Sequence, residues 1–214
     1  MSCAADILAA MDITKPADES EIAAFLQALS AGVAQVVIDY LLASVTSACT
    51  YTGTATGTGA GAFSALTASL FITEFESGLM AEEDVNNAFA QGFATGLQEL
   101  IGGGTITETV AGTLGGNPIS FTAVGSSHTA PAPSHTACAA ALERMSTEKP
   151  DEEDDMAEVE QEKLKLLANS LAKLIDDILP TVVVATVGQA PGAGSTGSGA
   201  VTASIPAVDS SFPA

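Results

Sequence analysis

The sequence predicts an α+β fold built from three degenerate helix–β-hairpin repeats, with the hairpins completing sheets between repeats or between subunits. Two observations carry this prediction. An apolar helical face recurs three times along the chain, and an almost uncharged Thr/Gly-rich tract follows each occurrence. The expected organisation is an N-terminal helical part with repeat one over residues 1–74, repeat two over 75–126, a Pro-rich linker and acidic spacer over 127–160, and repeat three over 161–214.

The recurring helical face follows the spacing i, i+4, i+8, i+11 and i+12, which places its members on one side of an α-helix. Every member is a large apolar residue. The three sets are Phe25, Leu29, Val33, Val36 and Val37; Phe89, Phe93, Leu97, Leu100 and Ile101; and Leu167, Leu171, Ile175, Ile178 and Leu179. We therefore expect three long helices of related construction, each burying one face.

The tracts that follow these helices have the pattern of β-strands. In the first tract, 45–70, threonines alternate with small or apolar residues, and this period of two is typical of a strand with two different faces. The second tract predicts a hairpin over 105–124 that turns at Gly115-Gly116-Asn117-Pro118. The third predicts two strands, 182–187 and 200–205, joined by a flexible Gly/Ser loop over 188–199.

These hairpins require a partner, because an isolated two-stranded hairpin is barely stable in water and leaves unpaired backbone groups at its edges. The tracts hold almost no Lys or Glu to protect those edges. We expect them to pair with another repeat or with another chain, and we expect apolar residues of the helices and strands to form interfaces. The residues predicted for that role are Phe25, Leu29, Val33, Phe89, Phe93, Leu97, Val110, Phe121, Leu167, Leu171, Ile175 and Val184.

The charge of the chain excludes several classes of partner. The net charge is −20, from six Lys and Arg against 26 Asp and Glu. Nucleic-acid binding needs a basic surface, and anionic membranes attract basic segments, so neither partner is expected. The uncharged stretch 22–38 approaches the length of a membrane span. Because its two counterpart helices carry charges, we interpret it as a more deeply buried copy of the same element.

Clustered carboxylates and cysteines are the candidate metal ligands. The run of acidic residues at 151–162 lacks the spacing and the central glycine of an EF-hand loop, and we interpret it as a solvated spacer. Cys3, Cys49 and Cys138 are widely separated and form no paired zinc motif, which indicates buried, reduced thiols in a protein made in a cytosol. No metal site is predicted.

The two histidines are the remaining catalytic candidates. His128 and His135 lie in a near-duplicated string that contains two prolines, so the sequence predicts an extended loop without the rigid turn that a nucleophile needs. The Gly-rich segments lack the Gly-Lys-Ser/Thr motif of a phosphate loop. We therefore predict no catalytic or cofactor-binding residue, no cofactor, and a protein that is not an enzyme.

An Ala-rich helix that leads into a Thr/Gly-rich hairpin, most clearly over 89–124 and less closely over 25–70 and 167–205, resembles small virion structural proteins of tailed bacteriophages. The resemblance implies a non-enzymatic subunit of a capsid, neck, tail or baseplate. Such a subunit would be made in the host cytoplasm, reside in the virion, and have itself and other virion proteins as partners. No functional residue carries over from this resemblance.

Two alternatives remain open at this point. The first is an extracellular or surface-layer binding module whose acidic segment binds a divalent cation, and the absence of a visible signal peptide speaks against it. The second is an enzyme that uses His128 or His135. A calcium titration separates the first alternative from the structural hypothesis, because a structural subunit needs no stoichiometric cation site.

Overall fold

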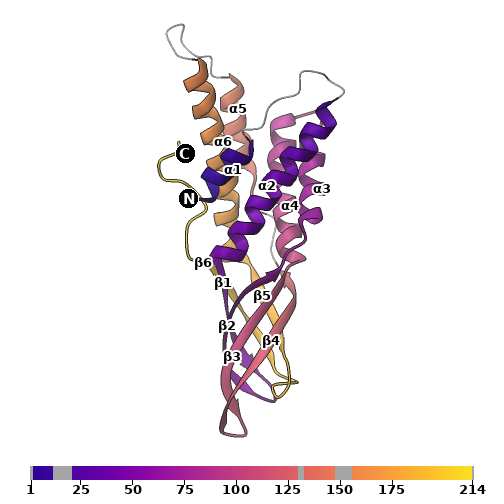
Figure 1. Cartoon of the computed structure of the whole chain (residues 1–214), viewed down its shortest axis with the longest axis vertical. Helices are drawn as coiled ribbons and strands as arrows, with labels where there is room; N and C mark the ends of the chain where they lie inside the picture. Colours follow the sequence, from indigo (N-terminus) through magenta and orange to yellow (C-terminus); the bar gives the residue numbers. More distant parts are fainter. Residues whose placement is uncertain (1, 12–20, 130–132, 148–155, 214) are drawn as a thin grey trace.

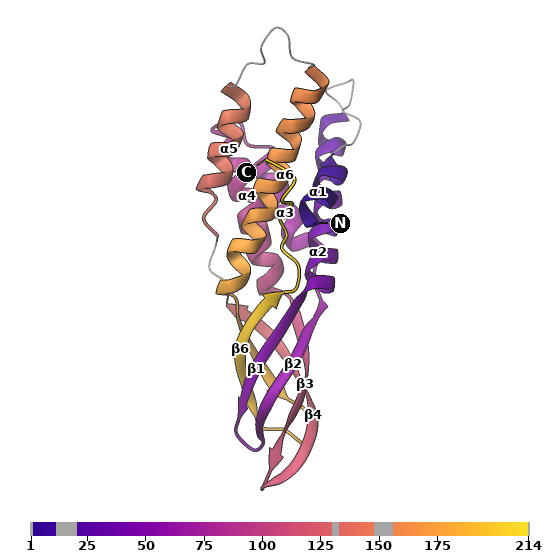
Figure 2. The same cartoon turned by 90° about the vertical axis from the view of Figure 1, so that its left-hand side faces the viewer.

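The computed structural model of the chain describes residues 2–11, 21–129, 133–147 and 156–213. The molecule is elongated, with helices at one end and strands at the other (Figure 1). The rotated view shows the strands as a narrow barrel, with both chain termini in the helical half (Figure 2). The predicted α+β class is confirmed, since the described residues form six α-helices and a closed six-stranded barrel.

The helices precede the strands in pairs along the chain. Their bounds are α1 Cys3–Met11, α2 Ile22–Ser44, α3 Ala68–Leu79, α4 Val85–Gly102, α5 Thr136–Thr147 and α6 Met156–Ile178, followed by a short 3₁₀ helix at Leu179–Thr181. Helices α2, α4 and α6 lie where the recurring apolar faces predict them. Helix α4 ends at Gly102, and the amide of Gly103 donates to the Glu99 carbonyl at 2.9 Å.

Helices α3 and α5 correct the expected organisation. Helix α5 lies inside 127–160, which the sequence analysis assigns to a linker and a spacer. Its Ala-rich sequence favours a helix, and its Cys138 and Ala141 are buried against the bundle. Helix α3 crosses the expected boundary at residue 74. The acidic run 151–155 lies outside the described residues.

The six strands follow one another around the barrel in chain order. Their bounds are β1 Val45–Thr52, β2 Thr56–Ala65, β3 Thr105–Leu114, β4 Asn117–Thr129, β5 Val183–Gly188 and β6 Thr196–Ala203. Each strand is antiparallel to its neighbours, and β1 pairs with β6 to close the ring. The threonine alternation does not form one continuous strand, because the chain turns at residues 53–55, where Gly53 has φ of 123°.

The hairpin edges were expected to pair with another repeat or with another chain, and closure of the barrel pairs them within the chain. Every described strand has hydrogen-bonded neighbours on both sides within the same chain. The strands therefore offer no open edge to a neighbouring subunit, and sheet completion between subunits is not how this barrel is satisfied. Closure also accounts for the scarcity of Lys and Glu in these strands, because a closed barrel has no edge to protect.

The connection between β5 and β6 is shorter and more ordered than a flexible loop over 188–199. Strand β6 begins at Thr196, and the amide of Gly188 donates to the Ser195 carbonyl at 2.9 Å. The Ser195 side chain is fully buried and accepts a hydrogen bond from the Ala55 amide at 2.8 Å. This contact ties the β5–β6 connection to the β1–β2 turn at the far end of the barrel.

The helical half has an aromatic core between α3 and α4. Phe71 and Phe75 of α3 both meet Phe93 of α4 with T-shaped ring contacts, at centroid distances of 5.2 and 5.6 Å. Gly92 lets the two helices approach closely, because a Cβ there would lie 2.8 Å from the Glu74 carbonyl oxygen. Aromatic packing and a small residue at the crossing thus hold this helix pair together.

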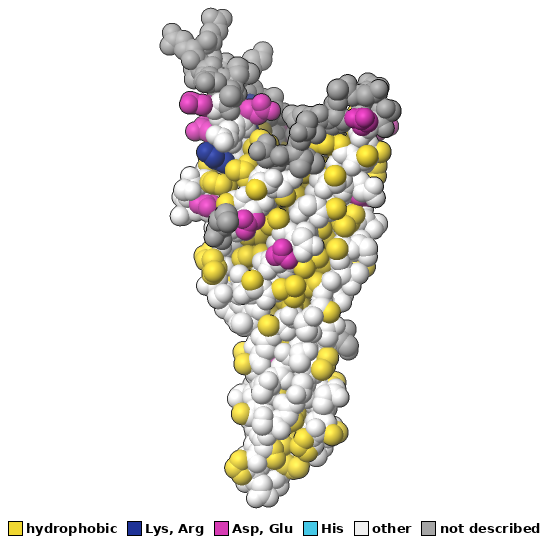
Figure 3. All heavy atoms as spheres, in the orientation of Figure 1, with side chains coloured by type: hydrophobic (Ala, Val, Ile, Leu, Met, Phe, Trp, Pro, Cys, Tyr) yellow, Lys and Arg dark blue, Asp and Glu magenta, His cyan; other side chains and the backbone are white. Residues whose placement is uncertain are grey.

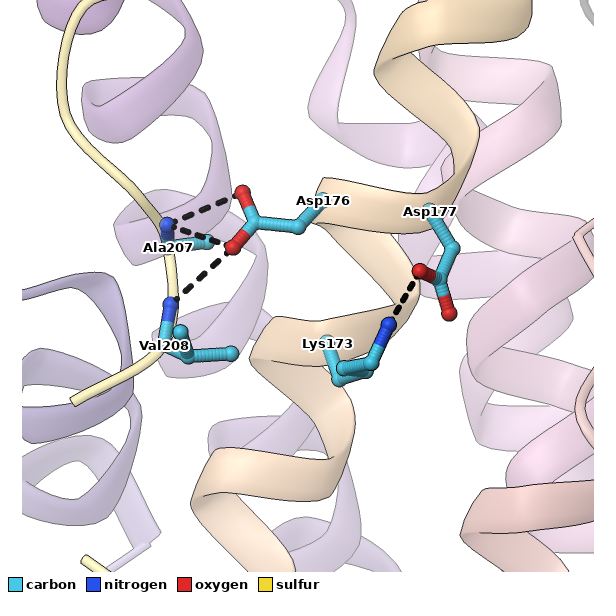
Figure 4. Close-up of polar contacts among 5 residues, drawn as sticks. All are labelled: Lys173, Asp176, Asp177, Ala207 and Val208. Atoms are coloured by element: carbon cyan, nitrogen blue, oxygen red, sulfur yellow. Dashed lines mark hydrogen bonds and ion pairs between the residues drawn. The ribbon is translucent and has the colours of Figure 1, made fainter. Parts of the chain in front are cut away.

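The C-terminal segment runs back from the barrel along the helices. The Asp176 carboxylate on α6 accepts hydrogen bonds from the amides of Ala207 and Val208 at 3.0 and 3.3 Å (Figure 4). The Tyr40 hydroxyl on α2 donates to the Ile205 carbonyl at 2.5 Å, and the amide of Ala4 on α1 donates to the Ala207 carbonyl at 2.9 Å. The tail therefore ties α1, α2 and α6 to one another.

Helix α2 is less enclosed than the sequence predicts. Among the described residues it is the one helix that is long and apolar enough to cross a membrane, with a mean hydropathy of 1.6 in its most apolar window, and 28% of that window is buried. A core helix of a soluble protein and a signal sequence meet the same criterion, so it does not by itself indicate a span. Ile22 and Leu42 are 43% and 41% exposed, which corrects the interpretation of α2 as a deeply buried copy.

Candidate functional site: an uncharged barrel with one buried carboxylate

The barrel differs from the rest of the molecule in its charge. The stretches 45–65, 105–129 and 183–203 contain one Asp or Glu, which is Glu108, and none of the six Lys and Arg. In the space-filling view, acidic side chains are seen over the helical half, while the visible face of the barrel is hydrophobic and uncharged polar (Figure 3). The outside of the barrel is thus a neutral surface on a strongly acidic protein.

The alternation of inward and outward residues along each strand determines which residues form that surface. In β1 the burial alternates strictly, so Thr46, Ala48, Thr50 and Thr52 face outward. Outward residues of the other strands are also mostly Thr, Ser and Ala. Hydroxyl-bearing and small side chains therefore cover most of the barrel, and they can contact another protein surface without desolvating a charge.

One strand departs from this pattern. On β5 the outward residues are Val183, Ala185 and Val187, and the two valines are 51% and 52% exposed. Across the ladders Val187 is paired with Val124 of β4, and Val183 with Ala200 of β6. We call Val183, Ala185 and Val187 the β5 stripe, and it is an apolar strip on the outside of the barrel.

The interior of the barrel is narrow, and glycines make room for a few large side chains. Tyr51 of β1 lies between two glycines on the flanking strands. A Cβ at Gly59 would lie 2.7 Å from the Tyr51 ring, and one at Gly197 would lie 2.5 Å from it. The glycines of the Thr/Gly tracts therefore have a packing role, in that they accept the ring of Tyr51.

Glu108 is the centre of a buried polar network inside the barrel. Its side chain is fully buried, and it accepts hydrogen bonds from the hydroxyl of Ser47, at 2.5 Å, and from the hydroxyl of Tyr51. The Tyr51 hydroxyl also lies 2.5 Å from the Thr186 hydroxyl. Strands β1, β3 and β5 are thus connected through the interior, across strands that are not neighbours in the ring.

Burial and the Glu108 carboxylate raise the pKa values of the neighbouring titratable groups. Burial raises the pKa of Cys49 from its ordinary 9.0 to about 12, and the contact with Glu108 acts in the same direction. The pKa of Tyr51 is also raised, mainly by burial and then by its hydrogen bond to Glu108. At neutral pH both groups are protonated, so Cys49 is not an activated nucleophile.

The network is closed to solvent. Ser47, Tyr51 and Thr186 are exposed by 2% or less, and Glu108 is not exposed at all. A substrate cannot contact the carboxylate without opening the barrel. Within the described residues no group of three or more His, Cys, Asp and Glu is arranged to hold a metal ion. The interior network therefore acts in holding the strands together.

A pocket of about 460 Å³ lies in the helical half, between α5, α6 and the C-terminal tail. Its apolar wall includes Cys138 and Leu174, and its polar groups include Arg144, Lys173 and Asp177. Lys173 forms a salt bridge with Asp177 (Figure 4). Burial raises the pKa of Cys138 to about 12, so this thiol also stays protonated.

The structure places the predicted interface residues in the interior. Eight are buried within the chain and four are partly buried, so none of the twelve is fully exposed to a partner. The buried residues are Val33, Phe93, Leu97, Val110, Phe121, Leu171, Ile175 and Val184, and the partly buried ones are Phe25, Leu29, Phe89 and Leu167. Apart from Phe25, the helical residues of this set lie in or against the bundle core, while Val110, Phe121 and Val184 fill the barrel.

The two histidines occupy different elements. His128 belongs to β4, so the predicted extended string begins as a strand of the barrel. His135 precedes α5, and its Nε2 lies 3.0 Å from Oδ1 of Asn87 on α4.

Glu108 is the residue that sequence reasoning missed. Its signal was available, because the period of two places Glu108 on the same strand face as Ile106 and Val110, both of which are apolar. A single carboxylate among inward apolar residues predicts a buried acceptor that needs donors. The donors themselves come from strands that are distant in the sequence.

Comparison with family models, with curated proteins and with solved structures gave no match for this chain. The functional argument therefore rests on the charge and geometry of the barrel.

Proposed function

We propose that this protein is a non-enzymatic structural subunit of a symmetric homo- or hetero-oligomeric assembly, and that the assembly is the virion of a tailed bacteriophage. The observation that carries the proposal is the division of the molecule into an acidic helical half and a neutral, elongated barrel. The barrel is the part that contacts other subunits, and the helical half keeps the particle soluble.

The construction of the chain supports this proposal. Each of α2, α4 and α6 leads into one antiparallel strand pair, and the three pairs together close one barrel. We infer that the chain arose from three helix–hairpin units, each of which leaves two strand edges that only the other units can satisfy. A structural subunit built in this way needs no catalytic group.

The closed barrel supports one manner of assembly. Because its edges are paired internally, contacts between subunits use strand faces and not added strands. The Thr-rich outer faces suit such contacts, since hydroxyls can donate and accept across an interface without the cost of burying a charge.

The experiment that tests the proposal is negative-stain microscopy of the purified chain, combined with light scattering over a range of salt concentrations. We expect a particle of defined size and symmetry. The comparison variant is Thr58→Glu, which adds a charge to an outward position of β2 without entering the core. A chain that stays monomeric at micromolar concentration at every salt concentration would contradict the proposal.

A further inference from the structure

Three of the seven exposed large apolar residues in the described part of the chain lie at one end of the molecule. Ile22 begins α2, Met80 follows α3 and Val85 begins α4, and these residues are 43%, 57% and 52% exposed. Helices α2 and α4 lead into strands of the barrel and α3 leaves one, so all three residues are at the end away from the barrel (Figure 1).

One hydrogen bond fixes how α2 and α3 face each other at this end. The Ser30 hydroxyl donates to the Glu76 carboxylate at 3.0 Å, and the two helices run in opposite directions. Residues four apart share a helix face, so Leu26 on α2 and Met80 at the end of α3 lie one turn beyond this contact, on facing sides. Ile22 lies one further turn out, so the exposed apolar residues of the two helices are neighbours.

The apolar core does not include these side chains. Among the described residues, Ile22, Phe25 and Leu26 of α2, together with Met80 and Val85, are neither part of the core nor packed against it. We call these five residues the outer patch. Phe25 is also one of the residues for which the recurring helical face predicts an interface role. The outer patch is therefore apolar area without a partner inside the described chain.

Acidic residues flank the outer patch, and no nearby basic residue in the sequence offsets them. Glu21 precedes the patch on α2, and Glu82, Glu83 and Asp84 stand between its two residues at the α3–α4 connection. All four are exposed, and within the described part of the chain none has a side-chain hydrogen bond or an ion pair. From residue 21 to residue 143 the sequence contains no Lys or Arg. The patch thus has an acidic rim that is open to a cationic partner.

Charge and apolar area together determine which partner fits. A second copy has net charge −20, and even its α6 holds five Asp and Glu against three Lys. Anionic lipid surfaces and nucleic acids are repelled by the same rim. A segment that has Lys or Arg on both sides of an apolar stripe is attracted by the rim and covers the patch.

The elements that form the patch favour a helical partner. The patch lies on helices and offers no strand edge, so an extended segment would leave its backbone groups unpaired there. A helix satisfies its own backbone and presents large apolar side chains one turn apart, which is the spacing of Ile22 and Leu26.

We propose that the outer patch docks a basic amphipathic helix of a different protein. Its large apolar side chains cover Ile22, Leu26 and Met80, and its Lys and Arg contact Glu21 and the acidic residues 82–84. This inference goes beyond the proposed structural function, which places contacts between subunits on the barrel. It assigns the opposite end of the molecule to a second kind of partner, and it does not depend on whether the chain forms a symmetric particle.

The first test uses synthetic peptides and isothermal titration calorimetry. The probe is a peptide of Leu, Ala and Lys, about 18 residues or five helical turns long, with Leu along one face and Lys on both sides of it. One comparison peptide replaces each Lys with Glu, and the other has the same composition as the probe in scrambled order. At about 0.1 M salt both should bind at least roughly tenfold more weakly than the probe, because the first is repelled by the rim and the second presents no apolar face.

A matched pair of variants locates the apolar contact. Ile22 and Leu42 both lie on α2 with nearly equal exposure, 43% and 41%, but at opposite ends of the helix. Ile22→Ser should weaken binding of the probe roughly fivefold, since the partly buried Ile side chain is lost from the contact. Leu42→Ser should leave binding unchanged. Circular dichroism and thermal melting show that both variants fold.

A second matched pair locates the charge contact. Glu82→Gln combined with Glu83→Gln removes two rim charges, whereas Asp39→Asn combined with Glu99→Gln removes two exposed charges near the barrel. The rim variant should weaken binding of the probe roughly threefold at about 0.1 M salt, and the control should not. At about 1 M salt, where the Debye length is about 3 Å, the loss in the rim variant should disappear while the loss in Ile22→Ser remains.

Several outcomes would overturn the inference. They are equal binding of the probe and either comparison peptide, and equal effects of Ile22→Ser and Leu42→Ser. Binding of the wild type to phosphatidylcholine vesicles that Ile22→Ser abolishes would assign the patch to a lipid surface. A smaller sedimentation coefficient of Ile22→Ser without peptide would assign it to a second copy. If the wild type forms no particle but binds the probe as expected, the proposed function fails and this inference stands.

Discussion

The barrel and the helical bundle of this protein are stabilised in different ways. The bundle buries large apolar side chains, with Phe71, Phe75 and Phe93 at its centre. The barrel has a core of few large residues. Glycines make room for them, and a polar network surrounds Glu108. The bundle is held by apolar area and tolerates exposed charge, whereas the barrel depends on close strand approach and satisfied hydrogen bonds.

The largest expected difference is between a methyl group added inside the barrel and one added at an open position of the bundle, away from the tight α3–α4 crossing at Gly92. Gly199→Ala places a Cβ on β6 that would overlap the backbone of β1 at Ala48, and we expect a loss of about 3 kcal/mol in the free energy of unfolding. Gly32→Ala on α2 meets Ala10 at an ordinary 3.7 Å and should stabilise the protein by about 0.5–1 kcal/mol. Urea denaturation measures both, and equal effects would contradict the comparison.

Removal of a carboxylate should lower the free energy of unfolding more in the barrel than in the bundle. Glu108→Ala removes the acceptor of the buried Ser47 hydroxyl and leaves Tyr51 with the Thr186 hydroxyl as its remaining partner, and we expect a loss of about 2 kcal/mol. Thermal and urea denaturation of the variant and the wild type provide the measurement.

The matched control for that variant is Glu76→Ala in the bundle. Glu76 accepts a hydrogen bond from Ser30 at 3.0 Å, but the Ser30 hydroxyl also reaches the Gln27 carbonyl at 3.1 Å. We therefore expect a loss below about 1 kcal/mol for the control. A Glu108→Ala protein as stable as the wild type would show that the interior network does not hold the barrel.

A smaller effect is expected where the tail ties the bundle together. Asp176→Ala removes the acceptor for the amides of Ala207 and Val208, and should cost about 1–2 kcal/mol. Its neighbour Asp177 forms an exposed salt bridge with Lys173, so Asp177→Ala should cost less than about 0.5 kcal/mol. Hydrogen exchange at residues 204–213 should accelerate in the first variant and remain unchanged in the second.

The smallest expected effect is a pH dependence of stability that the buried thiols of the two halves share. Burial raises the pKa of Cys49 in the barrel and of Cys138 in the bundle from 9.0 to about 12. The folded state favours the protonated thiols, so their contribution is fully present below pH 9.0 and is lost as the pH rises toward 12. Urea midpoints measured from neutral to alkaline pH should show this decline.

The modification rates of the same two thiols show how accessible the interiors of the bundle and of the barrel are. At about pH 8, near the ordinary pKa of a thiol, a disulfide reagent should modify Cys138 before Cys49. Cys138 lines the 460 Å³ pocket, whereas Cys49 lies inside the closed barrel. Single-cysteine variants assign the rates, and the reverse order would indicate that the barrel opens more readily than the bundle.

Local periodicity predicted the elements whose patterns are strong. Helices α2, α4 and α6 were predictable because their apolar residues recur on one face. Helix α5 was missed because nearby prolines and acidic residues gave the region the composition of a linker, and helix α3 because it directly follows a strand tract. The turn at residues 53–55 was missed because a threonine alternation continues through it.

The functional residues were harder to predict than the elements. The twelve apolar residues expected at interfaces are buried or partly buried in the chain itself, because the same apolar pattern marks a core face and an interface face. The β5 stripe shows the opposite case. Val183 and Val187 are apolar in sequence and exposed in the structure, since they alternate with the inward residues Val184 and Thr186.

The sequence by itself determined the α+β class, the three long helices, and the separation of an acidic part from a neutral Thr/Gly-rich part. These properties depend on composition and on periods of a few residues, which are local. Only the tertiary structure decided that β1 pairs with β6, that the edges are therefore closed, and that Glu108 meets Ser47 and Tyr51. These outcomes depend on the tilt and stagger of strands that lie far apart in the chain, which no local pattern records.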